Sequence, residues 1–265
     1  MDLIEVKHKE RTNRNGSRHP WELVRVDILK KLIAREITFP DKSIVVDIGC
    51  GDTFVVEQLA LNYPNVYFYA IDIAFTEELI NQYKEKLIIK NVFLYRSVEE
   101  FASEISQTVA LLILADVIEH IEYDKRFIKE LLQNKFVDNN TLFLITVPAF
   151  QFLFCSHDIF LGHYRRYTNK ILKNNLSASG LVIINIGYFF FSLLPIRVGQ
   201  VIKEKILGFD RNNISTGITT WRGSNAKSFF FKKILLADIN FTFFLNNVGI
   251  NLPGLSNYVI CKKSV

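Results

Sequence analysis

The chain has 265 residues, of which 49% are hydrophobic and 22% charged, so it can bury a sizeable core within one domain. Its net charge of +5 is mild and it has no dense run of Lys and Arg, which disfavours a nucleic-acid partner. Its three cysteines (Cys50, Cys155 and Cys261) lie far apart, which excludes a disulfide framework and a CxxC metal site.

The distribution of apolar residues gives no sign of membrane insertion. The chain begins without an apolar signal segment, so we expect a cytoplasmic protein. The most apolar stretch, residues 181–196, is shorter than the roughly 20 residues that a spanning helix needs. We expect it to be a buried strand that continues into a half-buried segment. Peripheral contact with a membrane stays open, because the region after residue 189 is rich in Phe.

Helices and apolar strands alternate through the first 148 residues. Pro20 and Glu22 favour the start of the first helix, and Ser97 followed by Glu100 is a capping pattern. This alternation is typical of a doubly wound α/β fold with a mostly parallel sheet. The expected helices cover 20–36, 54–62, 76–86, 97–105 and 123–136, and the expected strands cover 43–48, 66–72, 92–95, 109–116 and 141–148.

The second part of the chain has weaker patterns. Residues 150–167 predict an irregular loop, which is followed by a helix that Thr168 caps and Gly180 ends. We expect strands over 181–190 and 256–263, which complete a seven-stranded sheet, and a Phe-rich helix over 227–247. The whole chain, 1–265, is predicted to be a single domain, with a helical extension over 1–40 and an inserted cap segment over 189–253.

The first strand, in the sequence IVVDIGCGD (44–52), ends at a pair of glycines. Gly49 and Gly51 allow a tight turn and a close approach of the backbone to a ligand. Asp72, at the end of the next strand, can accept hydrogen bonds from a ribose diol. Together they predict a nucleoside-type cofactor at the carboxyl ends of the strands. GCGDTF lacks the third glycine of the GxGxxG fingerprint, which disfavours a nicotinamide-dependent reductase.

These pieces, in order, resemble the class I S-adenosylmethionine-dependent methyltransferases of the small-molecule type. The matching segments are VVDIGCGD, AID (70–72), LADVIEHI (114–121), TLFLITVPAF (141–150) and HDIFLGHYRRYT (157–168), the last of which resembles a loop of one branch, HD…GHxRRYT. The resemblance implies S-adenosylmethionine as cofactor and a Rossmann-like fold. It implies contacts to the methionine end from the glycine turn, to the ribose from Asp72 and to the adenine near Ser97. The predicted cofactor-binding residues are Asp47, Gly49, Cys50, Gly51, Asp72, Ile73, Ser97, Val98, Asp116 and Val117.

The chain departs from the family pattern at two places. Thr53 stands where the family often has a third glycine, and the segment YRSVE (95–99) lacks the acidic residue that often binds the adenine amino group. The adenine could then be bound by backbone groups alone. The same departures support an alternative, a catalytically inactive α/β module that binds a membrane surface or a partner protein.

The 157–168 loop is predicted to cover the methyl acceptor. Histidine can accept a proton near neutral pH, and Arg suits a carboxylate or a phosphate. We therefore expect His163 or His157 to act as a base or an orienting group, with His120 as the fallback. The expected acceptor is a small or lipid- or glycan-linked molecule with an acidic group, contacted by Arg166, Arg165, Tyr164 and Glu119. His157, Asp158 and His163 match no metal-ligand spacing, so no metal is predicted.

Overall fold

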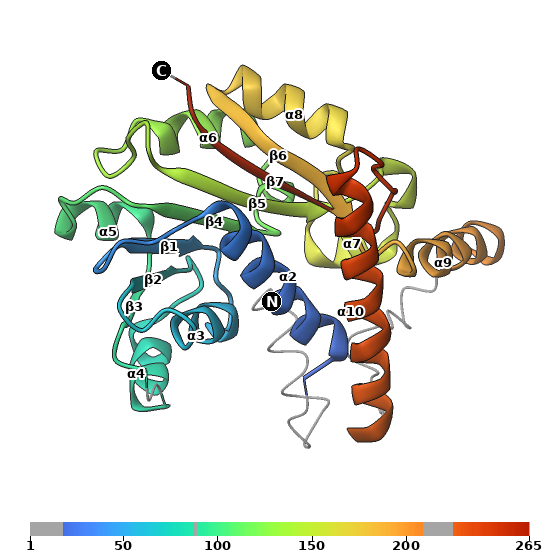
Figure 1. The fold of residues 1–265 in the computed structure, drawn as a ribbon, viewed down its shortest axis with the longest axis horizontal. Helices are drawn as coiled ribbons and strands as arrows, with labels where there is room; N and C mark the ends of the chain where they lie inside the picture. Colours follow the sequence, from blue (N-terminus) through green and yellow to red (C-terminus); the bar gives the residue numbers. More distant parts are fainter. Residues whose placement is uncertain (1–17, 87–88, 209–224, 265) are drawn as a thin grey trace.

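The computed structural model describes residues 18–86, 89–208 and 225–264. These residues form a seven-stranded sheet with the order β3-β2-β1-β4-β5-β7-β6 (Figure 1). Each strand lies within two residues of its predicted bounds. The strands are β1 (Ile44–Ile48), β2 (Tyr67–Ile71), β3 (Val92–Tyr95), β4 (Leu111–Ala115), β5 (Leu142–Pro148), β6 (Leu181–Phe189) and β7 (Ser256–Lys263).

The sheet is parallel from β3 to β5, and β7 runs antiparallel between β5 and β6. The strand order reverses between β1 and β4, which pair directly. Open α/β sheets bind ligands at such a switch point, outside the carboxyl ends of the strands. The doubly wound, mostly parallel seven-stranded fold predicted from the sequence is confirmed.

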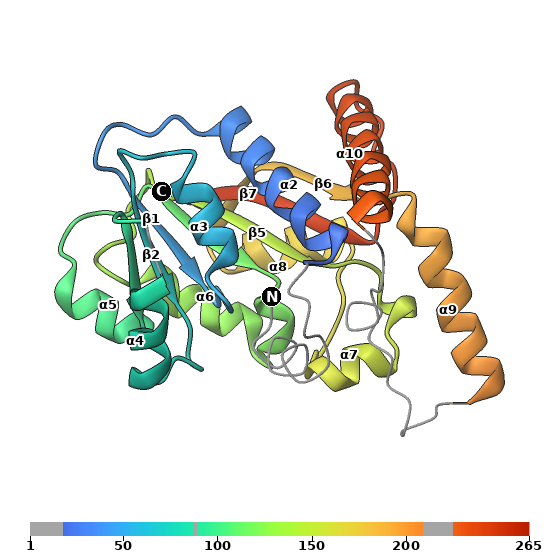
Figure 2. The ribbon, with the colours of Figure 1, turned by 90° about the horizontal axis from the view of Figure 1, so that it is seen from below.

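Helices cover both faces of the sheet (Figure 2). One buried cluster joins the sheet to α2 (Pro20–Glu36), α3 (Phe54–Ala60), α4 (Glu77–Lys86) and α10 (Asn225–Asn247). The other cluster joins it to α5 (Val98–Glu104), α6 (Asp124–Leu132) and α8 (Asn169–Ala178). Side chains of a strand alternate between the two clusters, so that Val45 and Val46 face opposite ways. The parallel strands are therefore buried on both faces, as their apolar sequences indicate.

Local signals set several helix boundaries. The Ser97 hydroxyl accepts a hydrogen bond from Glu100 N at 3.2 Å and caps α5. Thr168 caps α8 in the same way through Ile171 N. Gly180 follows the end of α8 in a left-handed conformation, at φ 99°. These capping predictions are confirmed.

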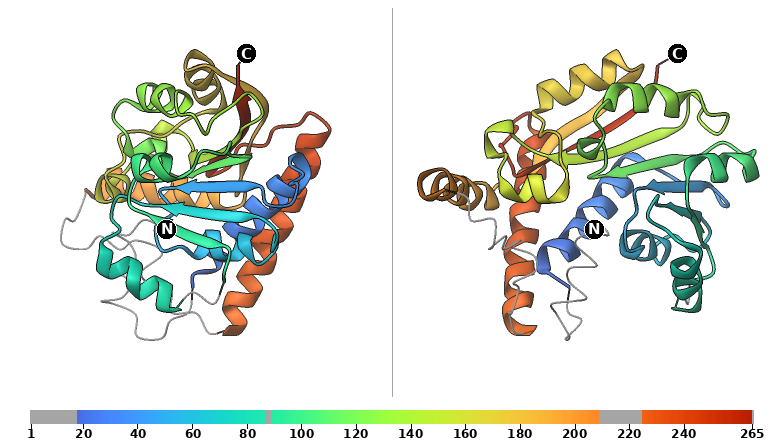
Figure 3. Two further views of the ribbon diagram at one scale, coloured as in Figure 1. Left: turned by 90° about the vertical axis from the view of Figure 1, so that its left-hand side faces the viewer. Right: turned by 180° about the vertical axis from the view of Figure 1, so that it is seen from behind.

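The structure differs from the sequence prediction in two segments. Residues 150–167 are not wholly irregular, because they contain η2 (Gln151–Leu153) and α7 (Ser156–Leu161). After β6 the chain forms α9 (Leu193–Leu207), which was not predicted and which leads away from the sheet (Figure 3). The Phe-rich α10 was predicted and packs beside α2. Among the helices that the structure describes, none combines the length and the apolar character needed to cross a membrane.

Gly254 offers a test of the packing where the chain enters β7. A Cβ at this position would overlap the backbone carbonyl of Phe189, and a backbone atom cannot move aside as a side-chain tip can. We expect Gly254→Ala to lower the free energy of unfolding by about 1–3 kcal/mol in urea denaturation. Gly199→Ala is the matched control, since its Cβ would meet no atom within 4 Å in α9 and alanine favours a helix. Equal stability of the two variants would contradict this packing.

Candidate active site

The glycine turn lies where β1, β2 and β4 end together. Gly49 and Gly51 have φ values of 73° and 64°, which favour glycine. A Cβ on Gly49 would lie 2.7 Å from the Val117 side chain, which follows β4. The amides of Gly49 and Cys50 both donate to Ile71 O at the end of β2, at 2.7 and 3.2 Å. The turn is therefore fixed against both neighbouring strands.

The Asp72 carboxylate is hydrogen-bonded to this turn. One oxygen accepts a hydrogen bond from Gly51 N and the other from Ala74 N, both at 2.9 Å. The carboxylate is half-buried, whereas the next residue, Ile73, is 93% exposed. The sequence placed Asp72 beside the glycine turn, and the structure brings the two together; their contact with a cofactor stays a prediction.

Asp47 has a buried carboxyl group, and one of its two oxygens accepts no hydrogen bond from the described residues. It is 2% exposed, and its Oδ1 has no hydrogen-bond partner among the described residues. Burial raises the pKa of Asp47 to about 7, an effect that the nearby Arg25 guanidinium opposes. Burial also raises the pKa of the Cys50 thiol, which therefore stays protonated. Asp47 is thus poised to interact with a positively charged group.

Thr53 stands where the family often has a third glycine, and its backbone conformation is strained. Thr53 adopts φ 63° as the residue before α3, a conformation that disfavours a branched side chain. Its hydroxyl donates to Glu57 Oε1 at 2.5 Å and to Asp52 O at 2.7 Å. These hydrogen bonds offset the strain, so the turn keeps its shape without a third glycine.

Ser97 and Val98 lie between the end of β3 and the first turn of α5. The Ser97 hydroxyl is occupied as the cap of α5, and the Val98 side chain is half-buried. Glu100 accepts hydrogen bonds from Arg96 N at 2.7 Å and from the Arg96 guanidinium at 3.2 Å. The structure therefore leaves backbone groups and the Val98 side chain as the parts of this segment suited to contact an adenine.

Asp116 connects the end of β4 to the first helix. One oxygen accepts from the Thr146 hydroxyl at 3.0 Å, and the other forms an ion pair with Arg25 of α2 at 2.8 Å. Asp116 has φ 58°, a strained conformation for a residue other than glycine. Arg18 forms a second contact of this kind, 2.6 Å from Asp52. The sequence did not predict either ion pair, because the partners lie far apart in the chain.

The short helix η1 (Ile118–His120) carries a second buried carboxylate. Glu119 is fully buried, and neither of its carboxylate oxygens has a hydrogen-bond partner among the described residues. Burial raises the pKa of Glu119 well above its usual value, and Asp116 adds to the shift. The rings of His120 and His163 lie 4.5 Å apart, nearly perpendicular. Glu119, His120 and His163 each have a possible ligand atom, and these atoms lie within 4.8 Å of one another.

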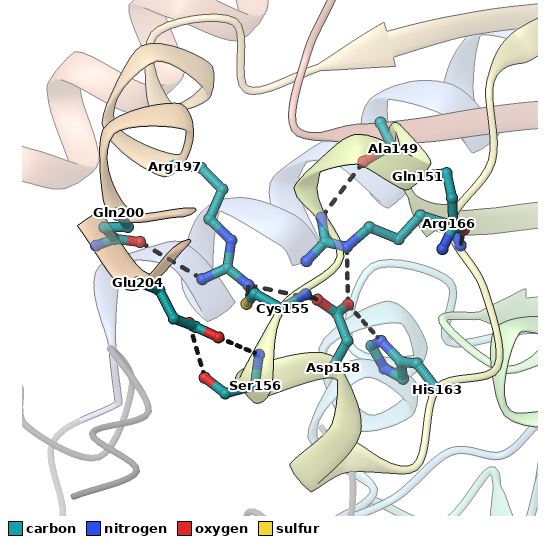
Figure 4. A network of polar contacts seen from close by, with 10 residues as sticks. All are labelled: Ala149, Gln151, Cys155, Ser156, Asp158, His163, Arg166, Arg197, Gln200 and Glu204. Carbon is teal, nitrogen blue, oxygen red and sulfur yellow. Dashed lines mark hydrogen bonds and ion pairs between the residues drawn. The ribbon is translucent and has the colours of Figure 1, made fainter. Parts of the chain in front are cut away.

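Asp158 organises the loop that leads to His163 (Figure 4). Its Oδ1 accepts from Arg166 Nε at 2.7 Å and contacts His163 Nδ1 at 2.9 Å. Its Oδ2 accepts from Cys155 N at 3.0 Å and lies 3.7 Å from the Arg197 guanidinium of α9. Burial by itself would raise the pKa of Asp158, but the contacts with His163 and Arg166 outweigh it and hold the pKa well below its usual value.

The remaining residues predicted from the loop have varied surroundings. Arg166 is buried and faces Asp158, and Arg165 pairs with Asp124 at 3.2 Å. Tyr164 is half-exposed, and its amide donates to Glu119 O at 2.8 Å. His157 lies outside the cluster of Glu119, His120 and His163, and burial lowers its pKa to about 4. The substrate and catalytic roles of these residues stay predictions.

No protein-family model matches the sequence, and no curated protein matches it. The fold does match solved structures. A coclaurine N-methyltransferase bound to N-methylheliamine and SAH has a TM-score of 0.56 and 12% identity, over 99% of this chain and 79% of that one. The plantazolicin methyltransferase BamL, in complex with a triazolic desmethylPZN analog and SAH, has a TM-score of 0.55 and 15% identity, over 99% and 90%. The cyclase SpnF has a TM-score of 0.51 and 12% identity, over 90% and 81%.

These likenesses extend over nearly the whole of this chain, so they establish its fold. Because the identities are low, they establish the fold alone. The chain therefore has the Rossmann-like fold of S-adenosylmethionine-dependent methyltransferases, with β7 inserted antiparallel between β5 and β6.

Proposed function

We propose that the chain transfers a methyl group from S-adenosylmethionine to a small-molecule acceptor. The observation that carries the proposal is the joining of the glycine turn to Asp72 at the switch point of the sheet, through the 2.9 Å hydrogen bond from Gly51 N. The solved structures of the same fold include two methyltransferases with bound SAH, the product of the cofactor. The sequence resemblance leads to the same activity independently.

Three features of the site fit this cofactor. The half-buried Asp72 carboxylate can accept hydrogen bonds from the ribose diol. The buried Asp47 carboxylate, with one oxygen that lacks a hydrogen bond, suits the protonated amino group of the methionine end. Gly49 and Gly51 carry no side chain, which allows the backbone of the turn to approach a ligand. When bound, S-adenosylmethionine supplies an electrophilic methyl group.

The chain's own contribution to the reaction is orientation and control of the acceptor. Holding an acceptor in line with the methyl group contributes up to about 7–11 kcal/mol to catalysis. His120, His163 and Glu119 lie just beyond Asp116 and are the groups suited to contact the acceptor. His157 is a weak base because burial lowers its pKa to about 4, so we assign the acceptor role to His163 and His120.

The nature of the acceptor is proposed only coarsely. Arg165 and Arg166 were expected to bind an acidic group, but each already faces a carboxylate of the chain. That weakens the case for an acidic acceptor. A lipid- or glycan-linked acceptor stays a prediction; the exposed Ile202 and Ile206 of α9 are consistent with an apolar ligand.

The proposal is tested by measuring saturable binding of radiolabelled S-adenosylmethionine to the purified chain, with SAH and NAD as competitors. We expect one molecule to bind per chain, SAH to displace it and NAD to leave it bound. Absence of saturable binding would favour the alternative of an inactive α/β module, and displacement by NAD would favour a nicotinamide-dependent enzyme.

Replacing Asp72 tests the ribose contact. We expect Asp72→Ala to weaken SAH binding roughly 10- to 100-fold in calorimetry, because a hydrogen bond to an ionised group contributes about 1.5–3 kcal/mol. Asp41→Ala is the matched control, since Asp41 is an exposed carboxylate before β1, bonded only to Asn65 among the described side chains. An Asp72→Ala protein that keeps the affinity of the wild type would exclude this assignment.

The pKa of Asp47 predicts how binding depends on pH. With a pKa of about 7, the carboxyl is mostly protonated at pH 6 and mostly ionised at pH 8. A positively charged ligand group selects the ionised form, so SAH affinity should rise about tenfold from pH 6 to pH 8. Calorimetry at both values checks this, with Asp47→Asn as the control that lacks the rise. A wild-type affinity as flat as that of Asp47→Asn would show that Asp47 does not face the ligand charge.

A further inference from the structure

The Glu119 carboxyl group is buried, and the described residues provide no hydrogen-bond donor for its two oxygens. Buried carboxylates are stable only when they are paired, protonated or bound to a metal ion. Asp116 disfavours a negative charge on Glu119, whereas the guanidinium groups of Arg25 and Arg166 favour one. A cation or a proton bound next to the Glu119 oxygens would therefore stabilise this buried carboxyl group.

Two imidazole rings complete a set of ligands around this carboxylate. Glu119 and His120 come from η1, whereas His163 follows α7, so that the ligands arrive from two separate segments. Their possible ligand atoms lie within 4.8 Å of one another. Bonds of about 2.0–2.2 Å join Zn²⁺ to His nitrogen and to carboxylate oxygen, so two ligand atoms of one ion lie at most about 4.4 Å apart. The three side chains would therefore have to draw slightly closer together as they bind one ion.

The surroundings of His163 prepare it for this role. Asp158 is ionised and also accepts a hydrogen bond from Arg166 at 2.7 Å, so the 2.9 Å contact requires His163 Nδ1 to carry the proton. When the ring carries only this proton, its lone pair lies on Nε2, the nitrogen that would then bind a metal. Metal-binding histidines commonly donate their other ring N–H to a carboxylate in this way.

We propose that Glu119, His120 and His163 bind one divalent transition-metal ion of the zinc type. Imidazole nitrogens favour such ions over Mg²⁺ and Ca²⁺, which prefer oxygen ligands. Three protein ligands leave at least one coordination position open, as in catalytic rather than structural zinc sites. The sequence analysis predicted no metal, because the ligand from the loop is remote in sequence from the pair on η1.

The open position gives the ion a task that rests on the proposed function. A hydroxyl of the acceptor bound there would become more acidic and release its proton to solvent. Its oxygen would then form the new O–CH₃ bond as the S–CH₃ bond of the cofactor breaks, leaving SAH. This assigns the acceptor to the class of alcohols or phenols.

The metal site is tested without activity. Chelator-treated protein is titrated with Zn²⁺ against a chromophoric chelator, and with Co²⁺ while the visible absorption is recorded. We expect the wild type to bind one Zn²⁺ per chain and to give a visible spectrum typical of Co²⁺ with a low coordination number. Glu119→Gln and His163→Gln should each lower the affinity for Zn²⁺ at least tenfold. His157→Gln is the matched control, a histidine of the same loop outside the cluster, and should bind as the wild type does.

The outcomes separate the two proposals. Failure of the wild type to bind one Zn²⁺, or an equal loss in His157→Gln and Glu119→Gln, would overturn the metal site, with circular dichroism confirming that the variants are folded. Protein that binds SAH but no metal would leave the proposed methyl transfer intact. Protein that binds one Zn²⁺ but no SAH would leave the metal site intact and exclude the methyl transfer.

Discussion

The arrangement of the site depends on how closely the ends of β1 and β4 approach each other. Gly49 lies so near the Val117 side chain that no side chain fits at that position. This contact exists because β1 and β4 pair directly at the reversal of the strand order. The glycine turn, Asp72, Asp116 and η1 all follow carboxyl ends of strands in this part of the sheet. A parallel sheet with this switch point therefore brings them to one edge, before any of their own contacts form.

The second level of organisation is electrostatic. Asp116 and Asp158 each receive a guanidinium and a further donor, so their charges are matched within the chain. Asp47 and Glu119 differ, since each is buried with at least one oxygen that has no hydrogen-bond donor among the described residues. Charge that the fold leaves uncompensated marks where a ligand can contribute. The likeness to the cyclase SpnF shows that the fold alone does not determine the reaction, so the function has to be argued from such groups.

Much of the fold could be predicted because its signals are local. The bounds of β3 and β7 follow from short apolar runs, and the caps at Ser97 and Thr168 follow from residues three positions apart. The helix α9 gives no such signal, since the Ser192 side chain does not cap its start and its apolar residues remain largely exposed. Candidate residues such as Asp72 and Glu119 could be picked from strand ends. The pairing of Arg25 with Asp116, and the convergence of Arg166, Arg197 and His163 on Asp158, could not, because tertiary packing alone creates them.

Two arginines contact the two sides of the glycine turn: Arg18, which lies just before α2, pairs with Asp52, and Arg25 of α2 pairs with Asp116. Without these arginines, Asp52 and Asp116 would lose their counter-charges. A chain shortened to begin at β1 would therefore lack both counter-charges, although its strands and crossovers would be complete. A truncated or circularly permuted chain that is to keep both ion pairs must retain residues 18–36, and any movement of α2 would change the electric potential at the glycine turn.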